Sequence, residues 1–356
     1  MYLFDSAHVW HVAKTGNDGN SGHAAQYPVS LASDAKLTIA AALAAAASGD
    51  TIVIWPGDYA EAVDASAKTL RIIGADRAKT RITPATGTPL TIGPDSYVRD
   101  LSAIGPSGGV YGTLIPLAGS GVTLENVYTW GDTDGLYVMA ASGTLHNLRL
   151  IRCHFKSDWD GAKLSATEGV FADRCLFETT GCSNASHALQ LPGSGVYRGC
   201  QFRAKTTETG SAELGAVNLA YGYNIRAVFD ACHFYCEAPA GRTGEVFGIK
   251  VADADDIAVL RNCVFVTIGA GASGGPQDIR QEAGSVIVAG CGYATTYGTI
   301  VQGGSGKIDQ AIKSLINKAV QNKATGVITY YDDDGVTALL TATPTDGATT
   351  ITRTPS

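Results

Sequence analysis

The sequence predicts an all-β fold in which short parallel strands coil into a solenoid. A pattern of cysteine, one variable residue and an aromatic residue recurs at intervals of 22, 25, 32, 31 and 28 residues, within the range typical of repeat proteins. The six copies are centred on Cys153, Cys175, Cys200, Cys232, Cys263 and Cys291. Forty-three glycines and only two methionines among 356 residues also favour short strands joined by tight turns.

Stacked coils place equivalent side chains over one another at about 4.8 Å per rung. We therefore expect a column of free, buried thiols, with the aromatic residues two positions later stacked beside it. The segment ENVY fits the same frame, with Asn126 at the thiol position. The chain has no C-x-x-C pair and no matching histidine pair, which argues against a zinc site.

Three segments are expected in order along the chain. Residues 1–50 form a glycine- and asparagine-rich loop and an Ala-rich capping helix, with Ser33 or Asp34 as its N-cap and Gly49 at its end. Residues 51–302 form the parallel β-helix. In residues 303–356 a flexible joint leads into a helix and a β-hairpin that turns at Asp334 and Gly335, and this segment serves oligomerisation or docking.

The amino-terminal pattern resembles a known group of proteins. The run TGNDGNSG, the Ala-rich helix, GDTIVIWPGDYAEAV and LRIIGAD are similar to the opening of right-handed parallel β-helix proteins of the pectin-lyase-like superfamily. The resemblance implies a right-handed coil. It implies no single activity, because this fold hosts lyases, hydrolases, esterases and non-catalytic fibres.

The carboxy-terminal segment carries a second resemblance. Ile308, Ile312, Leu315 and Ala319 have heptad spacing, so this short helix packs either in an oligomer or back on its own β-helix. The stretches LINKAVQNK, TYYDDDG and ITRTPS resemble the ends of bacteriophage tail and appendage proteins. That resemblance implies a homotrimeric virion protein with other virion proteins as partners, assembled in the host cytoplasm.

The best candidates for a chemical site are four aspartates. Asp132 and Asp134 precede one strand, and Asp158 and Asp160 precede the equivalent strand 26 residues later. A parallel stack would bring all four to one edge. There they could act as a general acid and base in glycan cleavage, bind Ca²⁺, or simply satisfy the backbone of β-turns.

A third resemblance sharpens the enzymatic reading. TDG, WDG, SHA and GIK are similar in order to the motifs of polygalacturonases. The resemblance implies that Asp134 and Asp160 are catalytic, that His187 supports them, and that Lys250 binds a substrate carboxylate. Three departures from the family pattern are Asp132 in place of Asn, Trp159 in place of Asp, and the missing glycines around the histidine.

Other polar and aromatic residues are weaker candidates. Trp159 or Trp130 would stack on a sugar ring or pack at an oligomer contact. His154 and His233 are expected to point outward into solvent. Four glutamates lie near the longest coils, where a groove would form: Glu208, Glu213, Glu237 and Glu245.

Charge and hydropathy limit the partners. The net charge is -7 and basic residues are scattered, so we predict no nucleic-acid partner. The most apolar early segment is about half the length of a membrane span, so we predict no membrane partner, and no motif predicts a cofactor. The favoured function is a non-catalytic phage structural protein. The alternatives are a tailspike-like depolymerase and a module that binds host surface glycan.

Overall fold

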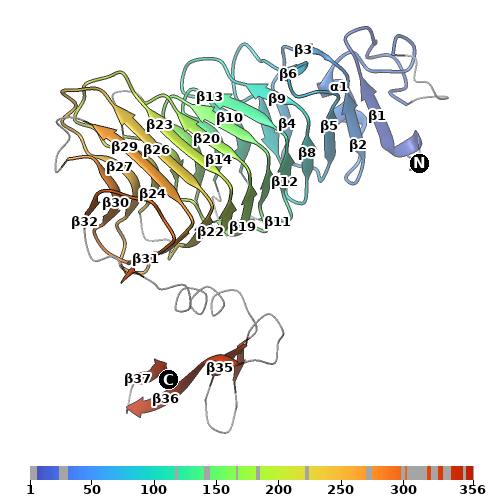
Figure 1. Ribbon diagram of the computed structural model, residues 1–356. Helices are drawn as coiled ribbons and strands as arrows, with labels where there is room; N and C mark the ends of the chain where they lie inside the picture. Colours follow the sequence, from blue (N-terminus) through green and yellow to red (C-terminus); the bar gives the residue numbers. More distant parts are fainter. Residues whose placement is uncertain are drawn as a thin grey trace.

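A computed structural model gives the architecture of the chain. It describes residues 6–23, 31–116, 119–139, 145–165, 167–181, 185–220, 224–269, 275–297, 301–302, 319–321, 328–331, 338–347 and 350–355. Most of these residues lie in short parallel strands that stack coil upon coil (Figure 1). Most of the predicted heptad helix and the predicted turn at Asp334 lie outside the described residues, but Ala319, the last heptad position, lies in a strand and not in a helix.

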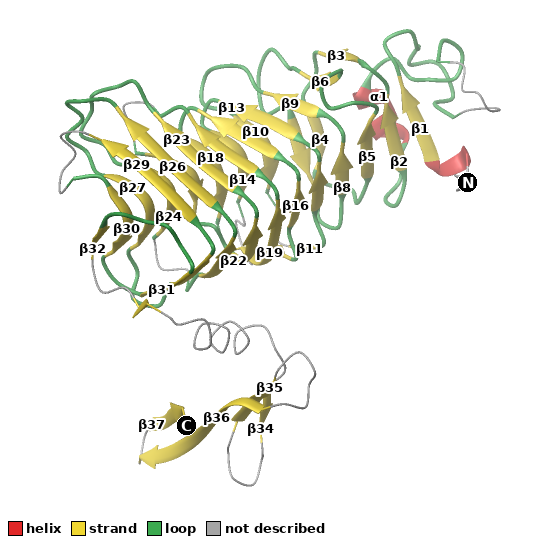
Figure 2. Cartoon of the chain, viewed as in Figure 1, coloured by secondary structure: helices red, strands yellow, loops and turns green. Residues whose placement is uncertain are grey.

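Three parallel sheets form the walls of the coil (Figure 2). Sheet A contains β1 (Val9–Val12), β2 (Thr51–Ile54), β5 (Arg71–Gly74), β8 (Tyr97–Arg99), β12 (Thr123–Glu125), β16 (Arg149–Ile151), β19 (Thr167–Asp173), β22 (Ser194–Arg198), β25 (Arg226–Asp230), β28 (Ile257–Arg261), β31 (Ser285–Ala289) and β33 (Val301–Gln302), with β11 (Gly119–Ser120) and β15 (Leu145–His146) beside them. Sheet B contains β3 (Gly57–Tyr59), β6 (Thr80–Ile82), β9 (Ser102–Ile104), β13 (Tyr128–Gly131), β17 (His154–Ser157), β20 (Leu176–Thr179), β23 (Gln201–Lys205), β26 (His233–Ala238) and β29 (Val264–Gly269). Sheet C contains β4 (Val63–Ala65), β7 (Leu90–Ile92), β10 (Tyr111–Ile115), β14 (Asp134–Val138), β18 (Asp160–Leu164), β21 (Ser186–Gln190), β24 (Leu214–Leu219), β27 (Val246–Val251), β30 (Gln277–Gln281) and β32 (Thr296–Tyr297).

The predicted cysteine column lies at the corner between sheets A and B. Cys153, Cys175, Cys200, Cys232 and Cys263 are buried and free, and Cys291 at the last rung is half-buried. Several of these thiols donate to a carbonyl of the coil before, as Cys232 Sγ does to Tyr197 O at 3.2 Å. Cysteine suits this corner because it is small and apolar and still carries a weak donor.

The aromatic column beside it is also present. Phe155, Phe177, Phe202, Phe234 and Phe265 follow one another with ring centroids 5.3, 5.2, 5.1 and 4.4 Å apart. The rings and the thiols belong to one continuous hydrophobic core that runs through the coil. The prediction that both side chains point inward is therefore confirmed.

The predicted frame for ENVY is wrong by one residue. Tyr128 pairs with His154, so Val127 occupies the column of Cys153, and Asn126 precedes it. Asn126 has a φ of 51°, a left-handed conformation that asparagine tolerates better than most residues. The asparagine is therefore a turn residue rather than a polar substitute for a thiol.

That left-handed residue recurs in every coil from the fourth onward. It is the first of two residues that join sheet A to sheet B, and the column residue is the second. The left-handed residues are Asp100, Asn126, Arg152, Arg174, Gly199, Ala231, Asn262 and Gly290, with φ between 51° and 60°. Coil length varies while this corner stays two residues long, so the variation falls at the other corners.

Helix α1 (Ile39–Ala45) begins later than predicted. Its N-cap is Thr38, whose hydroxyl accepts from Ala41 N at 3.1 Å. Asp18 accepts from the backbone of Leu37 and Thr38 at 2.9 Å, which fixes the chain ahead of the helix and leaves Ser33 and Asp34 in turns. The helix ends at Ala45, before Gly49, and buries Ile39, Ala42 and Leu43 in the core.

Two further elements complete the description. A short 3₁₀ turn, η1 (Ser6–His8), precedes β1. Near the carboxy terminus an antiparallel sheet D contains β34 (Ala319–Gln321), β35 (Ile328–Tyr331), β36 (Ala338–Gly347) and β37 (Thr350–Pro355) in that order. Within the described ranges, no helix is long and apolar enough to cross a membrane.

Candidate functional site

Three of the predicted site residues lie in one column at the start of the strands of sheet C. Asp134 on β14 pairs in register with Asp160 on β18, and Asp160 pairs with His187 on β21. All three side chains are buried. The 26- and 27-residue spacings thus bring two carboxyls and one imidazole together on successive rungs.

The two carboxyls have different surroundings. Asp160 Oδ1 accepts from His187 N at 2.9 Å and contacts His187 Nδ1 at 3.0 Å. The side-chain carboxyl of Asp134 has no hydrogen-bond partner among the described residues, although its backbone pairs with the neighbouring strands. Burial, reinforced by the neighbouring Asp160, raises the pKa of Asp134 well above its usual value, although Lys163 opposes the shift. Asp134 therefore keeps its proton to a higher pH than an ordinary aspartate.

His187 is held between two carboxylates. Nε2 lies 3.0 Å from Glu213 Oε1, opposite the contact between Nδ1 and Asp160. Burial lowers the pKa of His187, but the hydrogen bonds and charges of Asp160 and Glu213 outweigh it and raise the pKa to about 9. The imidazole is accordingly a cation at neutral pH and cannot accept a proton as a general base.

Glu213 joins this column to a second cluster of charges. Its Oε2 lies 3.1 Å from Lys250 Nζ, which also lies 3.4 Å from Glu245 and 3.6 Å from Glu282. Burial raises the pKa of Glu213, but His187 and Lys250 lower it more strongly, to about 2. Arg280 Nη2 completes the cluster at 2.7 Å from both Glu245 and Glu282.

We call these residues the sheet C charge network: Asp134, Asp160, His187, Glu213, Glu245, Lys250, Arg280 and Glu282. Lys250 faces three carboxylates and its side chain is only 13% exposed. It is therefore neutralised from within the chain, unlike the free cation that the resemblance to polygalacturonases implies for binding a substrate carboxylate.

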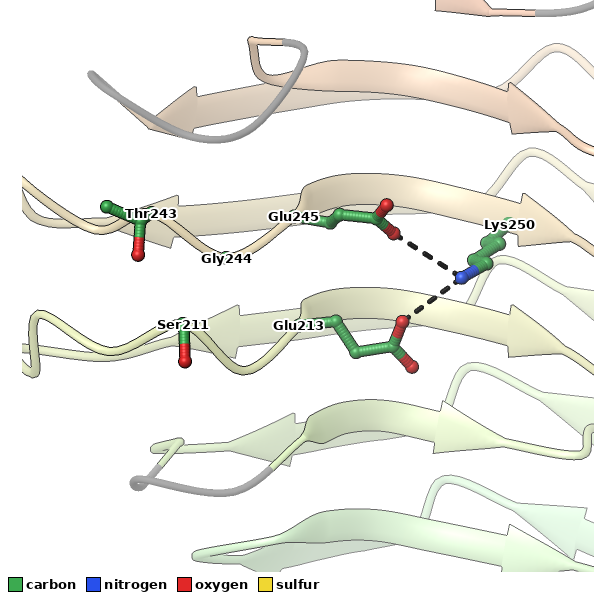
Figure 3. Close-up of a pocket in the computed structure, with 6 residues that line it drawn as sticks. All are labelled: Ser211, Glu213, Thr243, Gly244, Glu245 and Lys250. Carbon is green, nitrogen blue, oxygen red and sulfur yellow. Dashed lines mark hydrogen bonds and ion pairs between the residues drawn. The ribbon is translucent and has the colours of Figure 1, made fainter.

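A pocket of about 480 Å³ lies against this network (Figure 3). It is lined by Ser211, Glu213, Thr243, Gly244, Glu245 and Lys250. The two glutamates point toward the lysine from successive coils (Figure 3). The predicted groove between the longest coils is thus present as an open, polar pocket, and its charged groups already bind one another.

A buried arginine fixes the loops around this pocket. Arg242 is fully buried and donates to Glu208 O at 3.1 Å and to Ala212 O at 2.7 Å. A Cβ at Gly244 would lie 2.0 Å from Ala212 O, so the close approach of the two loops requires glycine there. Glu208 therefore contributes its backbone rather than its carboxylate.

The other two aspartates hold turns rather than joining the column. Asp132 Oδ2 accepts from Gly108 N at 3.1 Å and Gly109 N at 2.8 Å. Asp158 Oδ1 accepts from Thr180 Oγ1 at 2.6 Å. The expected crowding of four carboxylates is thus reduced to one pair. Among the described residues, no group of three or more His, Cys, Asp or Glu side chains is placed to hold a metal ion.

The remaining candidates are spread over the surface. The side chain of Trp159 is 42% exposed beside the aspartate column, whereas Trp130 is half-buried on β13. His233 is exposed as predicted. His154 is not, because its ring lies 3.0 Å from Glu178 and edge-on to Tyr128.

Glu237 lies outside the pocket and pairs with Lys205 at 2.8 Å. The sequence reasoning missed Arg280 and Glu282. Arg280 follows Lys250 in register on sheet C, so counting rungs from the lysine would have found it.

No family model and no curated protein sequence matches this chain. A solved structure described as Geobacillus virus E2 ORF18 matches at 12% identity with a TM-score of 0.52, covering 99% of this chain and 76% of that one. The chain is a right-handed parallel β-helix. The parallel β-helix fold that the resemblance predicts is thereby confirmed.

Two more distant matches have lower scores. A pectate lyase matches at 13% identity and a TM-score of 0.49, covering 84% of this chain and 82% of that one. A tailspike protein from Acinetobacter baumannii bacteriophage Fri1 is described as a capsular polysaccharide depolymerase. It matches at 12% identity with a TM-score of 0.42, covering 86% of this chain and 73% of that one. At these scores neither match bears on function.

Proposed function

We propose that this β-helix is a structural, non-catalytic component of a bacteriophage tail or head appendage. In this proposal helix α1 closes the amino-terminal end of the coil stack. Residues 303–356 join three copies into a homotrimer or dock them on other virion proteins, after assembly in the host cytoplasm. The phage-like carboxy-terminal stretches support the setting, and the right-handed coil is compatible with it.

The observation that carries the non-catalytic part is the closed bonding of the charge network. A hydrolase of this kind needs a free base and a clamp for its substrate. Here Asp160, the candidate base, is bonded to the cationic His187, and Lys250 is neutralised by three carboxylates. These contacts hold five successive coils of sheet C together, those of β18, β21, β24, β27 and β30, which is a structural task.

The test is the composition of the particle. Proteomics of density-purified particles of the phage that encodes this chain should detect it in a constant ratio to the major capsid protein. Immunogold labelling with antibody against the purified chain should decorate the tail or an appendage. Absence of the chain from intact particles would end the proposal.

A polysaccharide depolymerase is the second candidate, because one observation favours it. Asp134 has a raised pKa beside an aspartate that is hydrogen-bonded to a cation, which is the asymmetry that acid catalysis of glycoside cleavage uses. Trp159 is exposed nearby and would stack on a sugar of the host surface glycan.

Release of reducing ends from purified host polysaccharide decides between these candidates. The structural proposal expects no release by the wild-type chain. Release that is lost in both Asp134→Asn and Asp160→Asn, with unchanged melting temperature, would establish the enzyme instead. Retention of the chain on a polysaccharide column without cleavage would identify a glycan-binding module.

A further inference from the structure

Sheet B ends one rung before the two sheets beside it. Sheets A and C continue past the penultimate coil with β33 and β32. In sheet B the last coil contributes only Gly292, which bridges Val264 and accepts from Phe265 N at 3.1 Å. The chain then turns directly toward β32, because Asp278 Oδ2 accepts from Ala294 N and Thr295 N at 2.6 and 3.2 Å.

This shortcut leaves β29 as an open strand edge. Beyond Phe265 no described strand follows β29 on its outer side, so the backbone from Val266 to Gly269 is unpaired there. The outward side chains of Val264, Val266 and Ile268 are 43%, 43% and 50% exposed. The strand carries no charge, whereas the rung before it presents His233, Tyr235 and Glu237 at the same positions.

An uncharged open edge rich in β-branched residues readily pairs with another strand. Monomeric proteins usually protect such an edge with charge, proline or a covering loop. Among the described residues, no charge, proline or covering loop protects Val266 to Gly269. The side chains of Val266 and Ile268 are accordingly exposed to solvent. The flanking sheets A and C continue past this strand with β33 and β32.

We propose that the β29 edge is an interface with a second copy of this chain, whose extended segment adds the missing rung. Each copy also carries free strand edges elsewhere, because β34 and β37 each pair on one side only in sheet D. β34 is uncharged, like β29. When the open edge of β29 in one copy binds a free strand edge of the next copy, the contacts run head to tail. Such contacts can close into rings such as trimers.

This inference rests on the homotrimer proposed above and locates one of its contacts. The experiment uses the full chain and compares Val266→Lys with Gln201→Lys by light scattering and sedimentation equilibrium. Gln201 is also exposed on sheet B, but its strand β23 is paired on both sides. We expect an oligomeric wild-type chain and an oligomeric control, and a dissociation constant at least about 30-fold higher for Val266→Lys, because the lysine charge is left unpaired inside the interface.

An unchanged dissociation constant for a folded Val266→Lys variant overturns the proposed contact, and the trimer then stands on other contacts. A monomeric wild-type chain at all concentrations overturns both the contact and the trimer, but leaves membership of the particle to be decided by proteomics.

If Val266→Lys fails to fold, hydrogen exchange of the wild-type chain decides. The amides of Thr267 and Gly269, which alternate with those paired to β26 and point to the open side, should be protected in the assembled species and exchange freely on dilution. Free exchange in the assembled species overturns the inference.

Discussion

The substitution Glu213→Gln tests the charge network most directly. Glu213 lies between His187 and Lys250, and the two cations lower its pKa from 4.5 to about 2. Each pK unit corresponds to about 1.4 kcal/mol, so the network contributes roughly 2 to 3 kcal/mol after allowance for partial solvent screening. The raised pKa of His187 reflects the same contacts and is not added again.

The two pKa shifts define a pH window. The folded-state pKa of Glu213 is depressed, so its contribution is present above pH 4.5 and is lost as the pH falls toward 2. The folded-state pKa of His187 is raised, so its contribution is complete below pH 6.5 and is lost as the pH rises toward 9. The network is therefore strongest between about pH 4.5 and 6.5.

The assay is thermal unfolding by circular dichroism at one scan rate, at pH 5.5, 8 and 10. For a chain of 356 residues we expect Glu213→Gln to lower the melting temperature by about 3 to 4 °C at pH 5.5. The deficit should shrink at pH 10, where wild-type His187 has also lost its proton. The control Glu237→Gln breaks an exposed pair and should cost less than about 1 kcal/mol. A deficit of the same size at every pH would refute the electrostatic reasoning.

Three further predictions concern the corner and core of the coil. Phe177→Ala removes a ring stacked on both sides and should cost about 3 to 5 kcal/mol in denaturant unfolding, and a cost below about 1 kcal/mol would contradict continuous packing. Ala231→Gly relieves a left-handed residue with φ of 52° and should raise the free energy of unfolding by about 1 kcal/mol, which raises the melting temperature by about 1 °C, whereas a fall would contradict the strain. The buried thiols at positions 153, 175, 200, 232, 236 and 263 should resist a thiol reagent in the folded chain and react after unfolding. Rapid labelling of these six thiols in the folded chain would contradict their burial.

Much of the β-helix could be predicted from the sequence, because its repeat is local and its side chains are distinctive. A thiol and an aromatic two residues apart must point the same way in a strand, so Cys175 and Phe177 identify two interior columns at once. The error at Asn126 arose where the column residue changes from cysteine to Val127. Valine is too common to identify a repeat position, so the neighbouring Asn126 was assigned to the cysteine column instead of Val127.

The charge network was only partly predictable. Strand register places Asp134, Asp160 and His187 together, and this follows from coil length alone. Glu213 reaches His187 from the loop ahead of its strand, so its contacts depend on a loop conformation that periodicity does not specify. Arg280, by contrast, follows Lys250 in strand register and could have been located by counting rungs. The start of α1 was missed for a similar reason, since Asp18 in a distant loop determines where the helix begins.

The constant two-residue corner between sheets A and B has a consequence for how such a chain can change. From the fourth coil onward this corner does not vary in length, so a loop at either of the other two corners can lengthen, shorten or be exchanged while the thiol and phenyl columns keep their register. Such a protein can change its surface loops without changing the packing of its core. A segment grafted at the corner between sheets B and C, for example in place of residues 206–213, should leave the stacked thiols and rings of the core in place.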